Sequence, residues 1–228
     1  MLIQDLLIIF TAGISFAVGL LIVMRDRHAM VNIMYFLLTI FMSSWAISLL
    51  MFRTYEANDV AELFGRFSYI AGLLMVVFFY IFTRYFPYRD RMISRITIAF
   101  LVLISAITIY IMLFTDVLVS RVVVINGVVS MVTNPFVHGA YGLMLLTLLI
   151  LGIANLFLKK HNSGGDHRKQ IDSLLRVSLV AGIFGAVFDI FLPIFGDYSW
   201  NWLGPQFLVL LSVAVGMIIY SHKFTVHG

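Results

Sequence analysis

The stretch MVNIMYFLLTIFMSSWAISLLMF, residues Met30–Phe52, contains no charged residue and lacks the strict polar–apolar alternation of a barrel strand. A helix rises about 1.5 Å per residue, so crossing a hydrocarbon core about 30 Å thick takes roughly 20 apolar residues. Inside a bilayer only helices and closed barrels satisfy every backbone group, and a barrel strand alternates. This stretch therefore predicts one transmembrane helix.

Similar stretches fill almost all of the remaining sequence. The chain is 62% hydrophobic and only 11% charged, which leaves no room for a sizeable water-soluble domain among these residues. We predict an all-α membrane protein, a seven-transmembrane-helix bundle that forms a single domain over residues 1–228. The predicted spans are Leu2–Met24, Met30–Phe52, Phe64–Phe86, Met92–Phe114, His138–Leu158, Leu174–Phe191 and Leu203–Tyr220.

The distribution of positive charge predicts how the bundle is oriented. Of the 15 Lys and Arg residues, all except Arg53, Arg66 and Arg121 fall on one side of the predicted spans. Because cytoplasmic loops retain Lys and Arg, we expect the N-terminus outside and the C-terminus in the cytoplasm. The net charge of +4 then reflects basic loops that meet anionic membrane lipid, and we expect no nucleic-acid partner. The N-terminus lacks the basic region of a signal peptide, so we expect the first helix to be retained.

The longest predicted loop, about residues 115–136, lies on the outer side. Its β-branched segments, residues 121–125 and 128–132, flank Asn126-Gly127. This pattern is a strong hairpin signal, because a type I′ turn needs positive φ at both central positions. The loop predicts a short extracellular β-hairpin between the fourth and fifth helices. It is either a plain cap or a lid over an outer ligand pocket.

Asp189 is the one acidic residue clearly within a predicted span, about one turn before Pro193 and toward the outer side. An ionisable group in hydrocarbon is costly, so such residues usually face the bundle interior and often mark function. Three interpretations stay open. Asp189 is a protonated acid bonded to a neighbouring helix, a ligand- or proton-sensing site, or an interfacial residue reached by water.

Aromatic residues and one histidine near the outer side are further pocket candidates. Tyr198, Trp200 and Trp202 form either an interfacial belt or ligand contacts. His138 starts the fifth helix at a depth similar to that of Asp189, where an interfacial place is expected. The residues we assign to ligand binding or sensing are Asp189, Tyr69, His138, Tyr141 and Trp200. Four small residues favour close helix approach; they are Ala181, Gly182, Gly185 and Ala186.

Several classes of protein lack the residues they need. The four lysines all lie at the inner boundary, so no buried amine is available for a retinal Schiff base, and there is no cysteine. Motifs of hydrolases and nucleotide-binding enzymes are absent, and His161 and His167 have no third ligand for a metal. We therefore predict no enzyme site, cofactor or metal in this chain. A small transporter or channel is the alternative function, although few polar residues point inward; a purely structural membrane protein is a third.

The C-terminal third carries a pattern of motifs. Arg168-Lys-Gln170 precedes Asp189-Ile-Phe-Leu-Pro193, then come Leu203-Gly-Pro205 and Ile218-Ile-Tyr-Ser-His-Lys-Phe224. This pattern resembles the seven-transmembrane N-terminal sensor module of bacterial membrane histidine kinases. In that family the polar position before Leu-Pro is often Asn, so Asp189 adds a titratable group.

The resemblance implies a receptor in the bacterial cytoplasmic membrane. An outer or intramembrane signal, a small-molecule or lipophilic ligand, would shift helix packing, and the last helix would pass that shift to a cytoplasmic output domain. Tyr220, Lys223 and Phe224 would form the output segment. These residues include no phosphoacceptor helix or ATP-binding domain, so we expect the kinase in a further domain or in a separate partner. The resemblance also allows a homodimer.

Overall fold

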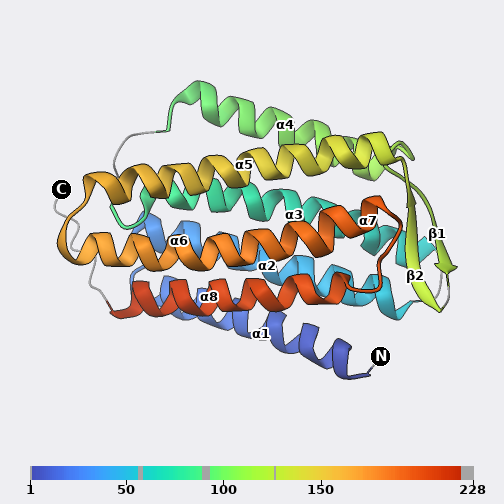
Figure 1. Ribbon diagram of the computed structural model, residues 1–228, viewed down its shortest axis with the longest axis horizontal. Helices are drawn as coiled ribbons and strands as arrows, with labels where there is room; N and C mark the ends of the chain where they lie inside the picture. Colours follow the sequence, from blue (N-terminus) through green and yellow to red (C-terminus); the bar gives the residue numbers. More distant parts are fainter. Residues whose placement is uncertain (1, 56–58, 89–92, 126, 222–228) are drawn as a thin grey trace.

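The computed structural model describes residues 2–55, 59–88, 93–125 and 127–221. In this part of the chain seven long helices lie side by side as a bundle (Figure 1), and each is apolar and long enough to cross a membrane. The predicted seven-helix architecture is confirmed. The elements are α1 (Leu2–Arg25), α2 (Met30–Thr54), α3 (Asp59–Tyr85), α4 (Arg95–Phe114), β1 (Val119–Ile125), β2 (Val128–Thr133), α5 (Pro135–Asn162), α6 (Gly165–Ala186), the π-helix η1 (Val187–Phe191), α7 (Leu192–Ile194), the 3₁₀-helix η2 (Asn201–Leu203) and α8 (Gly204–Ser221).

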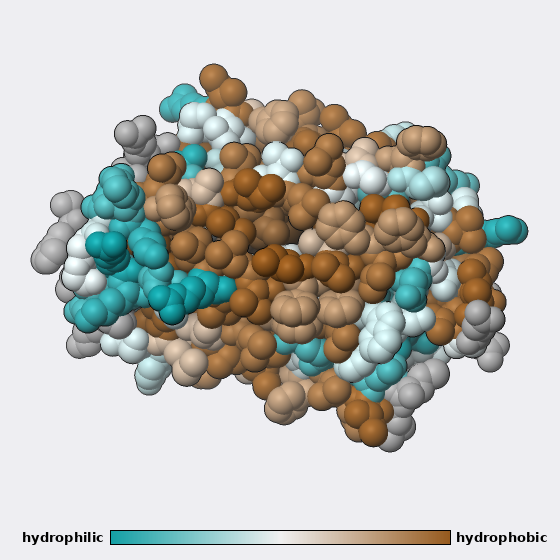
Figure 2. Space-filling model, in the orientation of Figure 1, coloured by the Kyte–Doolittle hydropathy of each residue, from teal (hydrophilic) through white to brown (hydrophobic). Residues whose placement is uncertain are grey.

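The surface of the bundle is that of a protein embedded in lipid. Figure 2 shows hydrophobic residues across the middle of the molecule and hydrophilic residues gathered toward its two ends. On α4, Val102, Leu103 and Tyr110 are each about 60% exposed, at 63%, 59% and 61%. A water-soluble monomer rarely exposes an apolar surface of this extent, whereas the hydrocarbon core of a bilayer matches it. The chain is a multi-pass membrane protein.

The helices α6 and α3 begin earlier than the predicted spans. Helix α6 starts at Gly165, whereas the predicted span started at Leu174. The first turns of the helix are polar, so the apolar pattern did not include them. Lys160 of α5 and Arg176 of α6 both form ion pairs with Asp172 of α6 in this region. Helix α3 starts at Asp59, an acidic residue in the first turn that stabilises a helix N-terminus. The apolar pattern thus located the membrane segments but not the full helices.

The central helices α2 and α3 contribute more buried residues than any other helices. Fifteen residues of α3 are buried, compared with four of α4, which lies at the edge of the bundle in Figure 1. One core cluster, around Leu49, Leu73 and Leu118, lies toward β1 and β2; we call this the hairpin end. A second cluster, around Phe82 and Leu174, lies toward the opposite end, where α8 finishes. We call that the output end.

The strands β1 and β2 form the predicted antiparallel hairpin. Ile125 pairs with Val128 and Val122 pairs with Met131. Gly127 has a φ of 76°, a conformation that favours glycine. Asn126 lies outside the described residues, so the turn type stays a prediction. Leu118 and Met131 are buried against the bundle, which fixes the hairpin over the helix ends.

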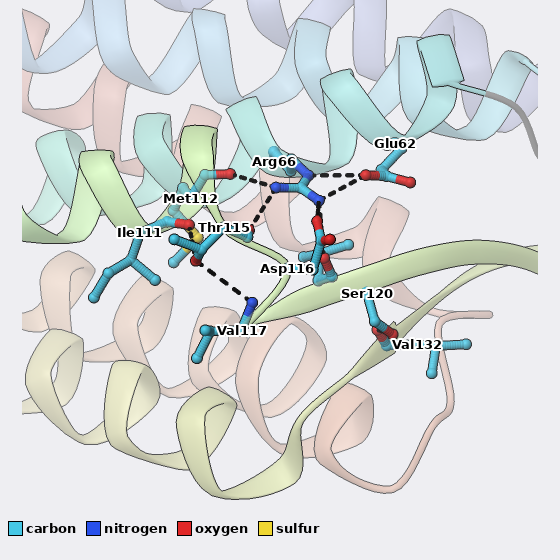
Figure 3. A network of polar contacts seen from close by, with 10 residues as sticks. Glu62, Arg66, Ile111, Met112, Thr115, Asp116, Val117, Ser120 and Val132 are labelled. Atoms are coloured by element: carbon cyan, nitrogen blue, oxygen red, sulfur yellow. Dashed lines mark hydrogen bonds and ion pairs between the residues drawn. The ribbon is translucent and has the colours of Figure 1, made fainter.

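Arg66 joins α3 to α4 and the hairpin (Figure 3). Its guanidinium donates to Glu62 Oε1 at 2.7 Å and to Asp116 Oδ1 at 2.6 Å. It also donates to the carbonyl oxygens of Met112, Thr115 and Val119 at 3.0, 2.7 and 3.0 Å. Arg66 is only 7% exposed. A buried cation at the last carbonyls of α4 satisfies groups that a helix end leaves free, so Arg66 fixes the geometry of the hairpin end.

Lys159 has a matching role near the output end. Its Nζ atom donates to the carbonyl oxygens of Arg84, Phe86 and Tyr88 at 2.8, 2.9 and 2.8 Å. Lys159 is 4% exposed, so its ammonium group forms hydrogen bonds with protein carbonyls in place of water. It joins α5 to the end of α3 and so stabilises the output end of the bundle.

Candidate functional site

A single turn of π-helix interrupts the sixth membrane span just before Pro193. Proline has no N–H group and its ring crowds the carbonyl four residues earlier, which is that of Asp189. The chain widens there, and the N–H of Leu192 donates to the carbonyl of Val187, five residues back. Asp189 lies in the middle of this π turn, η1. Turns of this kind inside α-helices are frequent at functional sites.

The carboxyl group of Asp189 packs directly against Gly204, the first residue of α8. A Cβ atom placed on Gly204 would lie 1.9 Å from Asp189 Oδ2, so any larger residue there would displace the carboxyl group. The N-terminus of a helix carries partial positive charge, which stabilises an acidic group by about 0.3–1 kcal/mol. Asp189 thus connects the π turn of the sixth span to the start of the seventh.

A cavity of about 140 Å³ opens beside Asp189. It is walled by α2, α3, α5, α6 and α8, and its lining is mostly aliphatic or aromatic. Tyr198, Asn201 and Met131 close it at the hairpin end, while Leu38 and Phe79 bound it deeper in the bundle. A cavity of similar volume, about 150 Å³, accepts benzene in another protein, so this one is large enough for a small organic molecule.

The small residues of α6 line this cavity. Ala181, Gly182, Gly185 and Ala186 all border it. A Cβ atom on Gly182 would lie 2.9 Å from Leu149, which is the close helix approach that the sequence predicted. By contrast, a Cβ atom on Gly185 would meet nothing within 4 Å. These small residues therefore have two roles. At Gly182 they allow α6 to pack closely on α5, and at Gly185 they leave open space beside the backbone.

Three polar atoms at this cavity have no hydrogen-bond partner within the described part of the chain. They are Ser178 Oγ, Asp189 Oδ2 and Tyr198 Oη. Ser178 and Tyr198 are 1% and 3% exposed. The side chains of Thr133 and Tyr69 lie near the Tyr198 hydroxyl without completing a hydrogen bond of ordinary geometry. Each unsatisfied buried group costs about 1–3 kcal/mol, so a molecule that pairs with them gains affinity.

Tyr198 corrects one sequence interpretation. As a belt residue it would face the membrane interface, but it points inward and packs edge-on against Phe52, with ring centroids 6.5 Å apart. Burial raises the pKa of Tyr198, so its hydroxyl keeps its proton and can donate a hydrogen bond. No periodicity in the short loop between the last two spans could have indicated this direction.

Tyr69, His138 and Tyr141 form a cluster at the hairpin end of the cavity. The Tyr69 hydroxyl lies 2.8 Å from His138 Nδ1, and the Tyr141 hydroxyl donates to the Tyr69 carbonyl at 2.6 Å. His138 Nε2 lies 3.4 Å from the carbonyl of Ile190 in the π turn. His138 is 1% exposed, so it is enclosed by protein, while its expected depth at the membrane interface stays a prediction. The cluster links α3 and α5 to the residue next to Asp189.

The five residues assigned from the sequence thus fall into two places. Tyr69, Tyr141 and Asp189 line the cavity, and His138 supports it through Tyr69. Trp200 is 50% exposed and borders a separate, open hollow with Gln4 and Arg53. Arg53 itself donates to Asn201 Oδ1 and Gln4 Oε1, both at 2.7 Å. Sequence reasoning missed Ser178, since a lone serine in an apolar span carries no distinctive signal. It included Gly204 in the Leu203-Gly-Pro205 motif but not its contact with Asp189.

At the output end, Arg25 of α1 holds the last turn of α8. It donates to the carbonyl oxygens of Ile219 and Tyr220, and its guanidinium lies 4.9 Å from the centre of the Tyr220 ring. Tyr220 is 64% exposed. The other two residues assigned to signal output, Lys223 and Phe224, lie outside the described residues.

Two comparisons with known proteins bear on this arrangement. A family model described as the N-terminal 7TM region of histidine kinase matches residues 7–227. The match includes the π turn, Asp189, the cavity and α8. A search of curated proteins finds no significant match.

Proposed function

The chain belongs to the family of N-terminal seven-transmembrane regions of histidine kinases, and we propose that the cavity beside Asp189 is where it binds its signal. As a member of that family, the chain is a transmembrane sensor module of the bacterial inner membrane. The module serves a cytoplasmic output domain. The bound ligand would be a small or lipophilic molecule that reaches the hairpin half of the bundle.

One observation carries this proposal: an apolar cavity in which three buried polar atoms lack partners. Ser178, Asp189 and Tyr198 come from two segments that meet at the cavity. A core that served stability alone would pair or remove such groups, because unsatisfied polar atoms destabilise a fold. Their cost is repaid when a ligand supplies the missing partners.

The contacts between the sixth and seventh spans supply a route for the signal. Besides the Asp189–Gly204 contact, Phe207 of α8 stacks on Phe184 of α6, with ring centroids 4.1 Å apart. It also lies parallel to Phe188 in the π turn at 6.0 Å. A ligand that favours one arrangement of η1 would therefore favour one position of α8. The segment from Tyr220 to Phe224 would pass that change to the output domain.

We further propose that the hairpin end faces outward and the output end faces the cytoplasm. The support is the uneven distribution of Lys and Arg. The chain has no cysteine, so single cysteines can report on each side. In intact cells a membrane-impermeant maleimide should label Ser120→Cys in β1, which is exposed, and should label His161→Cys near the end of α5 only after lysis. The reverse labelling would overturn this topology.

A transporter or channel is less well supported. Toward the output end Tyr35, Phe82 and Leu174 are fully buried in one apolar cluster. A continuous polar path would have to cross this cluster. Solute flux in liposomes containing the purified chain would favour the transporter.

The cavity itself is tested by filling it. Gly185→Leu places a large side chain in the open space of the cavity, and we expect it to fix the output in one state and abolish the response to signal. Gly13→Leu is the matched control, because Gly13 also has nothing within 4 Å but lies exposed on α1. Autophosphorylation of the full-length kinase, or of this module joined to a reporter kinase, is the measurement. Equal responses from both variants and the unmodified protein would contradict the proposed function.

A further inference from the structure

We infer that the cavity recognises a small amine: a cationic nitrogen on a short apolar chain, the whole molecule being about the size of benzene. This inference rests on the proposed function and names the class of its ligand. The geometry that leads to it is the placement of Asp189 among aromatic side chains, with no basic residue among the described residues of the cavity wall.

The first step concerns charge. Among the described residues that line the cavity, Asp189 is the one charged side chain. Arg53, the nearest basic residue in the neighbouring hollow, is already bonded to Asn201 and Gln4. The start of α8 supplies only partial positive charge. A carboxyl group surrounded by apolar groups holds a negative charge only beside a full countercharge, and a ligand ammonium group supplies it.

The second step concerns the aromatic lining. Trp45, Tyr69, Tyr141 and Tyr198 all border the cavity. Tyr69 and Tyr141 meet edge to face with centroids 5.1 Å apart. The faces of aromatic rings attract cations, and aromatic surroundings are a recurrent way to bind ammonium groups. A neutral or anionic ligand would gain nothing comparable from this wall.

The third step concerns hydrogen bonding and space. An ammonium group brings several N–H donors, which match the unpaired Oδ2 of Asp189 and the lone pairs of the Tyr198 hydroxyl. The rest of the cavity is formed by aliphatic side chains such as Leu49, Val76 and Leu145. With a volume of about 140 Å³ it accepts a short alkyl chain together with its amine.

The test compares three probes of similar size: n-butylamine, 1-butanol and butyrate. Each is titrated into the chain held in phosphatidylcholine nanodiscs, with empty nanodiscs as the blank for partition into lipid. Calorimetry gives the affinity of each probe. We expect the amine to bind at least about tenfold more tightly than the alcohol, a difference of about 1.4 kcal/mol. We expect no binding of the carboxylate.

Two variants assign the preference to its source. Asp189→Asn should reduce the advantage of the amine over the alcohol to about twofold or less. Asp197→Asn is the matched control, since Asp197 lies outside the cavity and accepts from the Ser199 N–H through Oδ1, a bond that Asn preserves. It should leave the amine preference unchanged. The comparison of probes on the unmodified chain stands even if Asp189→Asn does not fold.

Equal affinity for amine and alcohol, no binding of the amine, or a preference that survives Asp189→Asn would each overturn the amine inference. The proposed function has its own readout in the Gly185→Leu variant. If that variant fixes the kinase output while the amine shows no preference, the cavity is a sensing site for another class of ligand. If Gly185→Leu also leaves signalling intact, both proposals fail.

Discussion

Arg66 and Asp189 are two charged side chains in the hairpin half of the bundle, and their surroundings are opposite. Arg66 donates to two carboxylates and three backbone carbonyls. Asp189 has an inaccessible Oδ2 without a partner in the described part of the chain, and it borders an apolar cavity. The first group is fully satisfied by the protein, and the second is not.

The difference separates a structural role from a binding role. A buried charge whose hydrogen-bonding capacity is filled has nothing left to offer a ligand, but it fixes the elements that it joins. A buried charge with free capacity costs stability and gains when a ligand pairs with it. Lys159 belongs with Arg66, because three carbonyls satisfy its ammonium group. Substitutions should therefore affect folding at Arg66 and signalling at Asp189.

The largest effect on folding is expected for Arg66→Met. The change leaves carbonyl groups of α4 and the buried side of Glu62 without a donor, so the free energy of unfolding should fall by about 3 kcal/mol. Unfolding in mixed SDS micelles, followed by circular dichroism, measures this loss. Arg121→Met is the control, since Arg121 is exposed on β1 and should change stability little. Equal losses in the two variants would show that Arg66 is not a structural centre.

A smaller effect is expected for Gly204→Ala, which attacks the Asp189 site by crowding. The added Cβ atom overlaps the carboxyl group of Asp189, so either η1 or α8 must move, at a cost of about 1–3 kcal/mol. The same shift should alter the basal output of the kinase. Gly13→Ala in α1 meets nothing within 4 Å and should instead stabilise its helix by up to about 1 kcal/mol. Opposite signs in the same unfolding assay confirm that the Asp189–Gly204 contact is tight.

Asp189→Asn should alter the free energy of unfolding by less than about 1 kcal/mol, because no protein partner of Oδ2 is lost. Signalling should nevertheless fail, since the charge offered to the ligand is gone. Unfolding and kinase assays on the same preparation test the two statements together, with Asp197→Asn as the control. A loss of 3 kcal/mol or more would place Asp189 in the same class as Arg66 and would contradict a binding role.

Much of the fold follows from the sequence because lipid imposes simple requirements. Runs of apolar residues have to be helical in a bilayer, and the β-branched segments around Asn126-Gly127 have few alternatives to a hairpin. These features depend on neighbours in the sequence. The predicted spans accordingly agree with the seven long helices, apart from polar helix ends such as residues 165–173.

The site could be predicted only in part, because membrane helices are apolar on all sides. Their sequences give little indication of which face meets protein and which meets lipid. Asp189 stood out through its charge alone. The inward direction of Tyr198, the free Ser178 hydroxyl and the contact of Asp189 with Gly204 depend on residues brought together by packing. The motif around Pro193 marked the segment without revealing the π turn.

The smallest expected effect belongs to Tyr198→Phe, which removes an unpartnered hydroxyl from the cavity wall. Since no complete hydrogen bond is lost within the described residues, the free energy of unfolding should stay within about 1 kcal/mol or rise slightly. Affinity for a ligand that uses the hydroxyl should fall by a few fold. Tyr110→Phe is the control, because Tyr110 is 61% exposed on α4.

The effect of Tyr198→Phe on stability is easier to recognise from its pH dependence than from its magnitude. Burial raises the pKa of Tyr198 above its value of about 10 in an unfolded chain, so the folded state retains a proton that the unfolded state loses. Above pH 10 the unmodified protein therefore loses more of its stability than Tyr198→Phe, in which the contribution of this tyrosine is absent. Unfolding measured at pH 8 and pH 10.5 separates the two. An identical pH dependence in both proteins would mean that Tyr198 is exposed to water. The cavity beside Asp189 would then not be shielded from water by Tyr198.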